Sequence, residues 1–420
     1  MFPFPKRIAF SAWLLGLSAI LSACTASRAA SPIPQPTQHV EKKNTPATNP
    51  GTPAAEDAYA LEERLELLPE EEPPIGASSE FATDFSKHIV PFNEILSGGP
   101  PKDGIPAIDN PKFVNVIEAD EWLEDLEPVI LFQKGEETRA YPLQILTWHE
   151  IVNDTVAGQP VVVTFCPLCN TGIAFDRTVG SQVLDFGTTG RLRYSNLIMY
   201  DRQTETWWQQ ASGKAIAGEL TGTQLAFLPA AMISWAEFKA SFPDGEVLSR
   251  ETGFIRSYGR NPYGGYDDIN SSPFLYRGPC TPDILPAVAR VLTVDLSGEA
   301  VAFPYDVLQE VHVVNETVGD TDLVVIWEQG TASALDAGTL AEGRDVGTAN
   351  AYSRRLDGQM LTFVYDGDHI LDEQTGSQWD VLGRALGGQL AGEQLEAVVA
   401  INHFWFSWAA FKPETRIYQP

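Results

Sequence analysis

Cysteine is scarce in this chain, with four residues in 420, and only Cys166 and Cys169 are closely spaced. A zinc site built from cysteines alone would need a second Cys-x-x-Cys, and the sequence has none. The sequence also lacks a glycine-rich phosphate loop after a strand, a His-Glu-x-x-His motif and a Gly-x-Ser-x-Gly motif. The sequence therefore contains no local motif for nucleotide binding, for a zincin-type metalloprotease or for a serine hydrolase.

Basic residues are also few. The chain has 28 Lys and Arg against 56 Asp and Glu, a net charge of -28. Such a charge opposes binding of nucleic acid or anionic lipid through the body of the protein. A partner is expected to be neutral, cationic or a metal ion. At this length, with 44% hydrophobic residues, the chain has enough apolar surface for a large core or two ordinary ones.

The N-terminus contains the longest apolar run, from Ile8 to about Ala23, preceded by Lys6 and Arg7. The run is short for a spanning helix and is typical of an export signal. Its end, Leu21-Ser22-Ala23-Cys24, resembles a bacterial lipobox. We therefore expect residues 1–23 to be a signal peptide and Cys24 to carry the lipid. Membrane association is then through the anchor alone.

The anchored protein is expected in the cell envelope. No aspartate follows Cys24, which favours the periplasmic face of the outer membrane in a cell with two membranes. The cytosolic pool does not keep thiols reduced there. Residues 24–75 are rich in Pro, Thr, Ala and Asn and then in Glu, with few bulky apolar side chains. This composition predicts a disordered tether.

Beyond the tether the pattern predicts a β-rich α+β fold. Short helices are expected over 142–151 and 233–242, and a hairpin over 128–141. Strands are expected over 161–165, 172–177, 182–186, 197–201, 247–248 and 290–294. Residues 161–165 are β-branched or aromatic, so this strand should be buried and run directly into Cys166.

The second half of the chain resembles the first. Tyr141-Pro142 matches Phe303-Pro304, and residues 151–156 match 313–318 at the same offset. We therefore expect two pseudo-repeated halves, over 76–252 with an N-terminal wrapping segment and over 289–420, joined by a loop-rich connector over 253–288. The same offset places Cys166 opposite Glu328, Cys169 opposite Thr331 and His149 opposite Val311. Features confined to the first half are the better candidates for chemistry.

The Cys166-Pro167-Leu168-Cys169 stretch allows three interpretations. A redox dithiol would cycle through mixed disulfides, with Cys166 attacking and Cys169 resolving. A metal site of Cys166, Cys169 and His149 would suit copper or zinc. A structural disulfide would close a very small ring and contribute little stability.

His149 is the candidate to tune these thiols. It precedes Cys166 by a helix end and one strand, and an imidazolium beside a thiol lowers the pKa of that thiol. A histidine packed beside Trp148 is the simpler alternative. Cys280 lies in a predicted loop and is expected to be incidental.

Weaker candidates to line a pocket come from the strands after the cysteines and from the connector. They are Tyr200, Asp201, Arg177, Asn196 and Tyr263. Aromatic residues beside strands usually belong to the core, and a glycine-rich turn explains the segment around Tyr263 more simply.

Several motifs together resemble the DUF3179 family of bacterial and archaeal proteins of unknown function. They are Tyr141-Pro142-Leu143, Trp148 to Asp154, Thr164 to Cys169, Phe175-Asp176-Arg177, Ser195-Asn196-Leu197, Met199-Tyr200-Asp201, Asn261-Pro262-Tyr263 and Asp103 to Pro106. The resemblance covers roughly Thr83 to Tyr418. Some relatives are catalogued as possible selenoproteins, which implies a reactive chalcogen at Cys166 and Cys169. Cys280 is outside the family pattern.

These observations predict an envelope lipoprotein with a thiol site at Cys166 and Cys169. Thiol–disulfide redox or other thiol-dependent chemistry is the leading hypothesis, with a protein thiol or disulfide as partner and no required cofactor. A copper- or zinc-binding protein using the same cysteines is the first alternative. A non-enzymatic envelope scaffold or interaction module is the second.

Overall fold

The computed structural model describes residues 66–279 and 284–420. Strands make up 39% and helices 12% of it, which confirms the β-rich α+β class. No helix within these two ranges has the length and apolarity to span a bilayer. The predicted signal peptide, the lipidation site Cys24 and the loop residue Cys280 lie outside the described residues.

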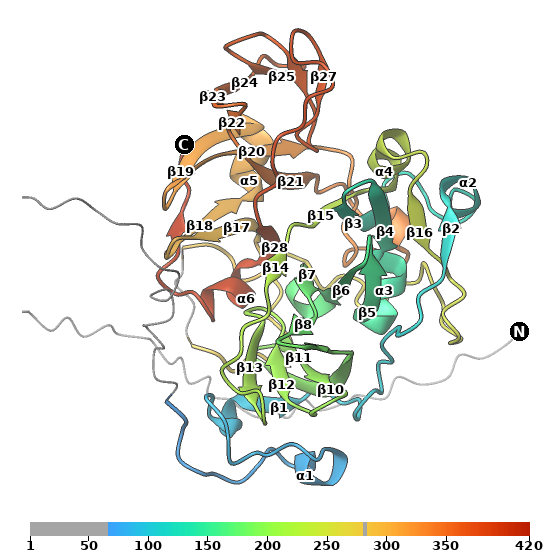
Figure 1. The fold of residues 1–420 in the computed structure, drawn as a ribbon, viewed down its shortest axis with the longest axis vertical. Helices are drawn as coiled ribbons and strands as arrows, with labels where there is room; N and C mark the ends of the chain where they lie inside the picture. The colour runs from blue at the N-terminus through green and yellow to red at the C-terminus, as the bar shows by residue number, and fades with distance from the viewer. Residues whose placement is uncertain (1–65, 280–283) are drawn as a thin grey trace, which may run out of the picture. The chain divides into compact units, whose positions relative to one another are not determined.

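Residues 95–248 form three larger sheets (Figure 1). The first has the order β15-β3-β4-β16-β2, with bounds Ala231–Ser234, Pro128–Lys134, Glu137–Pro142, Glu246–Leu248 and Phe113–Asn115. The second is β14-β7-β6-β5, with bounds Phe227–Leu228, Thr171–Asp176, Gln159–Cys166 and Ile151–Val156. The third is β1-β10-β11-β12-β13, with bounds Ile95–Ser97, Phe186–Arg193, Asn196–Asp201, Trp207–Gln209 and Lys214–Ala217.

Residues 290–417 also form three larger sheets. Their orders are β28-β17-β18-β29 (Ala400–Phe404, Arg290–Leu296, Glu299–Pro304, Arg416–Ile417), β19-β20-β21 (Val313–Val318, Thr321–Glu328, Thr348–Ser353) and β24-β25-β26-β27 (Phe363–Tyr365, Ile370–Asp372, Gln378–Trp379, Ala385–Gly387). Two small hairpins complete the strands, β8-β9 (Thr178–Val179, Gln182–Val183) and β22-β23 (Arg355–Leu356, Gln359–Met360). One buried cluster takes side chains from both halves, including Val129, Ile233, Ile326 and Trp379.

The described residues contain six α-helices, all short. They are α1 (Ala77–Glu80), α2 (Val116–Ala119), α3 (Leu143–His149), α4 (Trp235–Ser241), α5 (Tyr305–Val311) and α6 (Trp405–Ala409). Three 3₁₀ turns accompany them, η1 (Phe92–Glu94), η2 (Pro167–Cys169) and η3 (Leu340–Glu342). The predicted hairpin is confirmed as β3–β4, the predicted helix after Pro142 as α3, and the predicted strand into Cys166 as β6.

Several element boundaries differ from the sequence prediction. Ile151, expected in the helix after Pro142, begins β5. Ile233 belongs to β15, where it pairs with Val129, and α4 begins only after Ser234, whose side chain accepts a hydrogen bond from the Glu237 N–H. Ser at this position is a favoured helix N-cap, which explains the later start. The predicted strand over 182–186 is split, because the Leu184 N–H bonds to the Arg177 carbonyl rather than to a strand partner.

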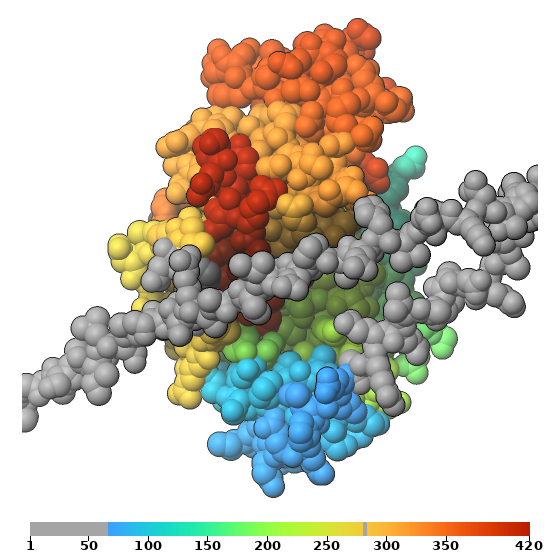
Figure 2. Space-filling view, turned by 90° about the vertical axis from the view of Figure 1, so that its left-hand side faces the viewer, coloured from blue at the N-terminus to red at the C-terminus, as the bar shows by residue number. Residues whose placement is uncertain are grey.

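The segment before β1 lies against the first half. Figures 1 and 2 show it in blue at one end of the described chain. The Leu68 N–H donates to the His88 carbonyl at 2.9 Å, and the Phe92 N–H donates to the Glu71 carboxylate at 2.7 Å. Leu68 and Glu71, at the end of the predicted tether, therefore bond to the body.

Asp201 closes the turn between β11 and β12. Its carboxylate is fully buried and accepts hydrogen bonds from the Thr204 N–H at 2.6 Å and the Trp208 indole N–H at 2.9 Å. Asp201→Ala leaves these donors without an acceptor, so we expect the free energy of unfolding to fall by about 2 kcal/mol. Asp372 makes the same contacts with Thr375 and Trp379.

Chemical denaturation of the two alanine variants tests this prediction. Asp372→Ala is expected to lose stability by a similar amount, because the donors left behind are of the same kind. A wild-type denaturation midpoint in Asp201→Ala would contradict the structural role of this turn.

Candidate functional site

The Cys-x-x-Cys stretch is a single 3₁₀ turn at the end of a buried strand. Cys166 is the last residue of β6, η2 begins at Pro167, and Asn170 ends the turn with a φ of 50°. Proline suits the start of such a turn because its fixed φ is helical and its missing N–H would have no partner. Both cysteines are free, and they are 2% and 0% exposed.

Both sulfurs lie against one carbonyl group. Ser195 and Tyr194 form the turn between β10 and β11 with φ values of 68° and 54°. The Ser195 carbonyl oxygen is 3.9 Å from Cys166 Sγ and 3.4 Å from Cys169 Sγ. Asn196 Nδ2 donates to Cys169 Sγ at 3.4 Å. A carbonyl acceptor favours thiols over thiolates, because only a thiol has a proton to donate.

Burial raises the pKa of the Cys166 thiol well above its ordinary value. The hydrogen bond with Cys169 and the negative charges of Cys169 and Glu150 raise it further, and the Leu197 N–H only partly offsets them. The lowered thiol pKa expected from a neighbouring imidazolium is therefore absent. The Cys166 thiol is therefore neutral in the resting state.

His149 is held away from a role as thiol tuner. Nδ1 donates to the Pro106 carbonyl at 2.7 Å, which leaves Nε2 to accept from the Tyr258 hydroxyl at 2.7 Å. Burial lowers the pKa of His149, with a smaller contribution from the positive charge of Arg256, so the imidazole is neutral. The structure thus uses His149 to join the loop before β2 to the connector, which corrects its assignment as an imidazolium beside Cys166.

Glu150, the next residue, is the group that sequence reasoning missed. It ends α3 with a φ of 59°, is 8% exposed, and its carboxyl has no hydrogen-bond partner in residues 66–279 and 284–420. Burial raises the pKa of this carboxyl to about 8. The sequence signal that could have identified Glu150 was an acidic residue at the end of the predicted helix. The second half has no acidic residue at the matching position. The matching helix end after α5 is His312, with a φ of 60°.

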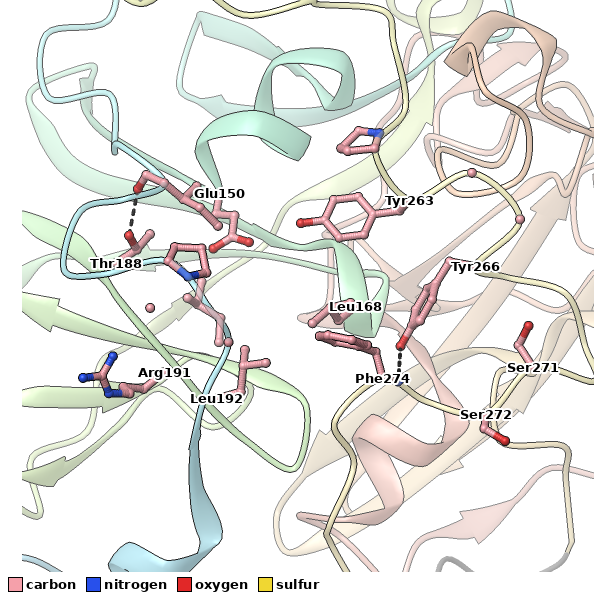
Figure 3. Close-up of a pocket in the computed structure, with 18 residues that line it drawn as sticks. Glu150, Leu168, Thr188, Arg191, Leu192, Tyr263, Tyr266, Ser271, Ser272 and Phe274 are labelled. Atoms are coloured by element: carbon pink, nitrogen blue, oxygen red, sulfur yellow. Dashed lines mark hydrogen bonds between the residues drawn. The ribbon is translucent and has the colours of Figure 1, made fainter. Parts of the chain in front are cut away.

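The Glu150 carboxyl faces a cavity of about 520 Å³, here called the Glu150 cavity. Figure 3 shows this carboxyl and the Tyr263 hydroxyl pointing toward one another. The other lining residues come from the loop between β1 and β2, the cysteine turn, β10, β11 and the connector. They include Ile105, Leu168, Thr188, Leu192, Leu197, Tyr266 and Phe274.

The weaker site candidates divide into two groups. Tyr263 lines the Glu150 cavity and Asn196 contacts Cys169, so both belong to the site. Tyr200 donates to the Asp103 carboxylate, Asp201 closes the β11–β12 turn, and Arg177 bonds to the Leu184 carbonyl. These last three residues do not line the Glu150 cavity, and their contacts are those of the scaffold.

The ligand set proposed for a metal is not assembled. No three His, Cys, Asp or Glu side chains in the described part of the chain are grouped so that they could hold a metal ion. The bonds that occupy both nitrogens of His149 explain why this side chain is unavailable to the cysteines. Copper or zinc binding through Cys166, Cys169 and His149 therefore lacks its third ligand.

Comparison with known proteins identifies the family. The family model described as "Protein of unknown function (DUF3179)" matches residues 102–415. The chain belongs to this family. No curated protein and no solved structure matches it. The matched residues contain the cysteine turn, Glu150 and the connector.

Proposed function

We propose that this protein is an exported lipoprotein whose Cys166–Cys169 pair cycles between dithiol and disulfide. The observation that supports this most directly is the turn itself, which holds two free cysteines beside one carbonyl group and close enough for Cys169 to raise the pKa of Cys166. Cys166 is assigned the attacking role and Cys169 the resolving role, since Glu150 influences the pKa of Cys166.

The reaction with a small disulfide R–S–S–R proceeds in two exchanges. The Cys166 thiol loses its proton and its sulfur attacks one sulfur of R–S–S–R, forming a mixed disulfide and releasing one R–SH after protonation. The Cys169 sulfur then attacks Cys166 Sγ, which closes the internal disulfide and releases the second R–SH. Two electrons leave the protein, and the two thiol protons appear on the products.

The proposed cellular location is based on the N-terminal sequence. A signal peptide over 1–23 and lipid on Cys24 would retain the protein at the envelope, with the outer membrane favoured where two membranes exist. A dithiol in that compartment depends on its local partner for reduction or oxidation. A protein thiol or disulfide is the alternative partner, and it requires the site to open.

We also infer that the two halves arose by duplication. Asn153 bonds to both backbone groups of Phe186, and Asn315 bonds in the same way to Phe363. The sheets of the two halves have corresponding strand orders, each with a central hairpin followed by a short helix. The thiol site would then be a property that only the first half has.

The Cys169→Ser variant tests the redox function. In the full-length protein on a Cys280→Ser background, glutathione disulfide is expected to form a stable mixed disulfide at Cys166, because the residue that would release it is gone. Intact-protein mass spectrometry measures the adduct. Cys166→Ser is the matched control and is expected to react far more slowly, since Cys169 is fully buried.

The parent protein should show a reversible internal disulfide in glutathione buffers of graded potential, detected by alkylation of the two cysteines. If alkylation of neither cysteine changes across the redox range, the proposed function is wrong.

A further inference from the structure

One buried amide side chain faces the sulfur of Cys169. Asn196, the first residue of β11, is 0% exposed, and its Nδ2 donates to Cys169 Sγ at 3.4 Å. The Ala211 N–H donates to the Oδ1 of the same amide at 3.0 Å. A backbone N–H can only donate, so the oxygen of the amide faces Ala211 and its nitrogen faces the sulfur.

Two glutamines of the next strand and turn hold this amide in place. Gln209 Nε2 donates to Asn196 Oδ1 at 2.6 Å, and Asn196 Nδ2 donates its second proton to Gln210 Oε1 at 2.8 Å. Gln210 Nε2 donates in turn to the Thr164 hydroxyl at 3.0 Å. All of these side chains are buried. The donor aimed at Cys169 is therefore already in position before the sulfur becomes charged.

Asn196 and the Ser195 carbonyl have opposite effects on the sulfur. Cys169 Sγ donates to the Ser195 carbonyl oxygen at 3.4 Å, a bond that exists only while the sulfur carries a proton. The bond from Asn196 Nδ2 remains when the proton leaves, and a hydrogen bond to a charged acceptor is about twice as strong as one to a neutral acceptor. Asn196 therefore stabilises the thiolate of Cys169 more than its thiol.

The second half lacks this arrangement together with the cysteines. Strands β11 and β12 match β25 and β26, because each pair is closed by a turn aspartate that binds the tryptophan of the second strand. In this register Asn196 matches Gly367, and Gln210 matches Val381. Amides needed only to build the sheet would be expected in both halves. The presence of the thiols explains better why the first half buries them.

We propose that Asn196 is a catalytic residue of the thiol site, which stabilises the negative charge on Cys169 Sγ when this sulfur attacks a mixed disulfide at Cys166. This inference rests on the redox function proposed above. In the step concerned, the Cys169 S–H bond breaks and an S–S bond to Cys166 forms, while the bond between Cys166 and the sulfur of the small thiol breaks. The departing sulfur takes up a proton, so one R–SH leaves and no further oxidant is needed.

The resolving step can be measured separately in the full-length protein on the Cys280→Ser background. The rate of the first exchange rises with the concentration of glutathione disulfide, whereas the rate of the second does not. At high concentration the formation of the internal disulfide therefore reaches a plateau rate, which is the rate of the attack by Cys169. Acid quenching and intact-protein mass spectrometry measure the mixed and internal disulfides.

Asn196→Asp is the main variant. It keeps an oxygen to accept from Gln209 and Ala211 and replaces the donor Nδ2 with a second oxygen. We expect the plateau rate to fall about 100-fold, as for the loss of one donor to a developing negative charge. The mixed disulfide should accumulate, while its formation at Cys166 should keep the parental rate. Asn196→Ala, which removes the donor without adding a carboxylate, is used if the aspartate variant does not fold and should lose about tenfold.

Asn153→Asp is the matched control. Asn153 is 1% exposed and also lies in the first half, but it bonds to both backbone groups of Phe186 and to Asp109 rather than to a sulfur. This variant should lower the free energy of unfolding and leave the plateau rate unchanged. Equal slowing in Asn153→Asp and Asn196→Asp would show a general effect of a damaged core and would overturn the inference.

The failure of this inference differs from that of the redox function. If the parent forms the internal disulfide and Asn196→Asp forms it with the same plateau rate, the role of Asn196 is overturned and the redox function stands. If the parent forms no internal disulfide with glutathione disulfide, the redox function itself fails.

Discussion

Asp267→Ala is expected to lower the free energy of unfolding by about 3–5 kcal/mol and to release the connector from the Glu150 cavity. Asp267 is 1% exposed and accepts hydrogen bonds from Arg290 at 2.6 Å and from Arg344 at 2.9 Å. The Ser333 hydroxyl donates to the same carboxylate. Removing this carboxylate leaves the buried Arg290 guanidinium without its counter-charge, which costs more than the pair itself contributes.

The connector depends on this carboxylate because it has no regular structure of its own. The described residues between Leu248 and Arg290 contain no helix or strand. Asp267 directly follows Tyr266, which lines the cavity, so the ion pair holds the cavity wall against the second half. Burial alone would raise the pKa of Asp267, but Arg290, Ser333 and Arg344 hold it below its ordinary value. The stabilisation is therefore present at neutral pH and is lost only as the pH falls through this lowered pKa.

Urea denaturation and limited proteolysis measure the two effects. The Asp267→Ala protein should be cleaved within 253–279 much faster than the wild type. Asp336→Ala is the control, since Asp336 binds Arg344 in a pair that is largely exposed and should contribute less than about 1 kcal/mol. Equal stability and equal cleavage of the two variants would show that Asp267 does not hold the connector.

Glu150→Gln is expected to be more stable than the wild type at pH 8.5, while the two proteins differ little near pH 4.5. Burial raises the pKa of Glu150 from 4.5 to about 8 in the folded protein. Between these values the folded state holds a proton that the unfolded chain has lost, so wild-type stability falls as the pH rises. The expected loss across this range is on the order of 3–5 kcal/mol. Glutamine does not ionise and avoids it.

The neighbouring groups do not obscure this dependence. Burial raises the pKa of Cys166 well above its ordinary value, and it also raises the pKa of Tyr263, so both stay neutral over the same pH range. Denaturation midpoints at pH 5 and pH 8.5 provide the measurement. Glu219→Gln, at an exposed position, should follow the wild type at both pH values. Parallel pH profiles for the wild type and Glu150→Gln would show that the carboxyl is not buried.

Local sequence patterns were sufficient to predict the elements whose conformation depends on one continuous segment. The β-branched and aromatic run over 161–165 predicts a buried strand, and β6 extends from Gln159 to Cys166. Pro142 at the start of an apolar 3.6-residue pattern predicts a helix, and α3 begins at Leu143. The same strand signal places Cys166 at the strand end, where β6 stops and η2 begins.

The environment of the thiols was not predictable in the same way. His149 and Glu150 are adjacent in sequence, yet the positive φ of Glu150 turns it into the cavity, while Pro106 and Tyr258 bind both nitrogens of His149. Those partners lie 43 and 109 residues away along the chain. The spacing of residues along a helix does not show which of two adjacent side chains will contact a loop that is distant in the sequence.

The sequence by itself determined the family, the β-rich class and the position of two cysteines at the end of a buried strand. Only the tertiary structure decided the chemistry around them. It enclosed both thiols, raised the pKa values of Cys166 and Glu150, and brought Tyr263 from the connector to face the carboxyl. The physical reason is that pKa shifts arise from burial, which depends on segments that are far apart in the chain.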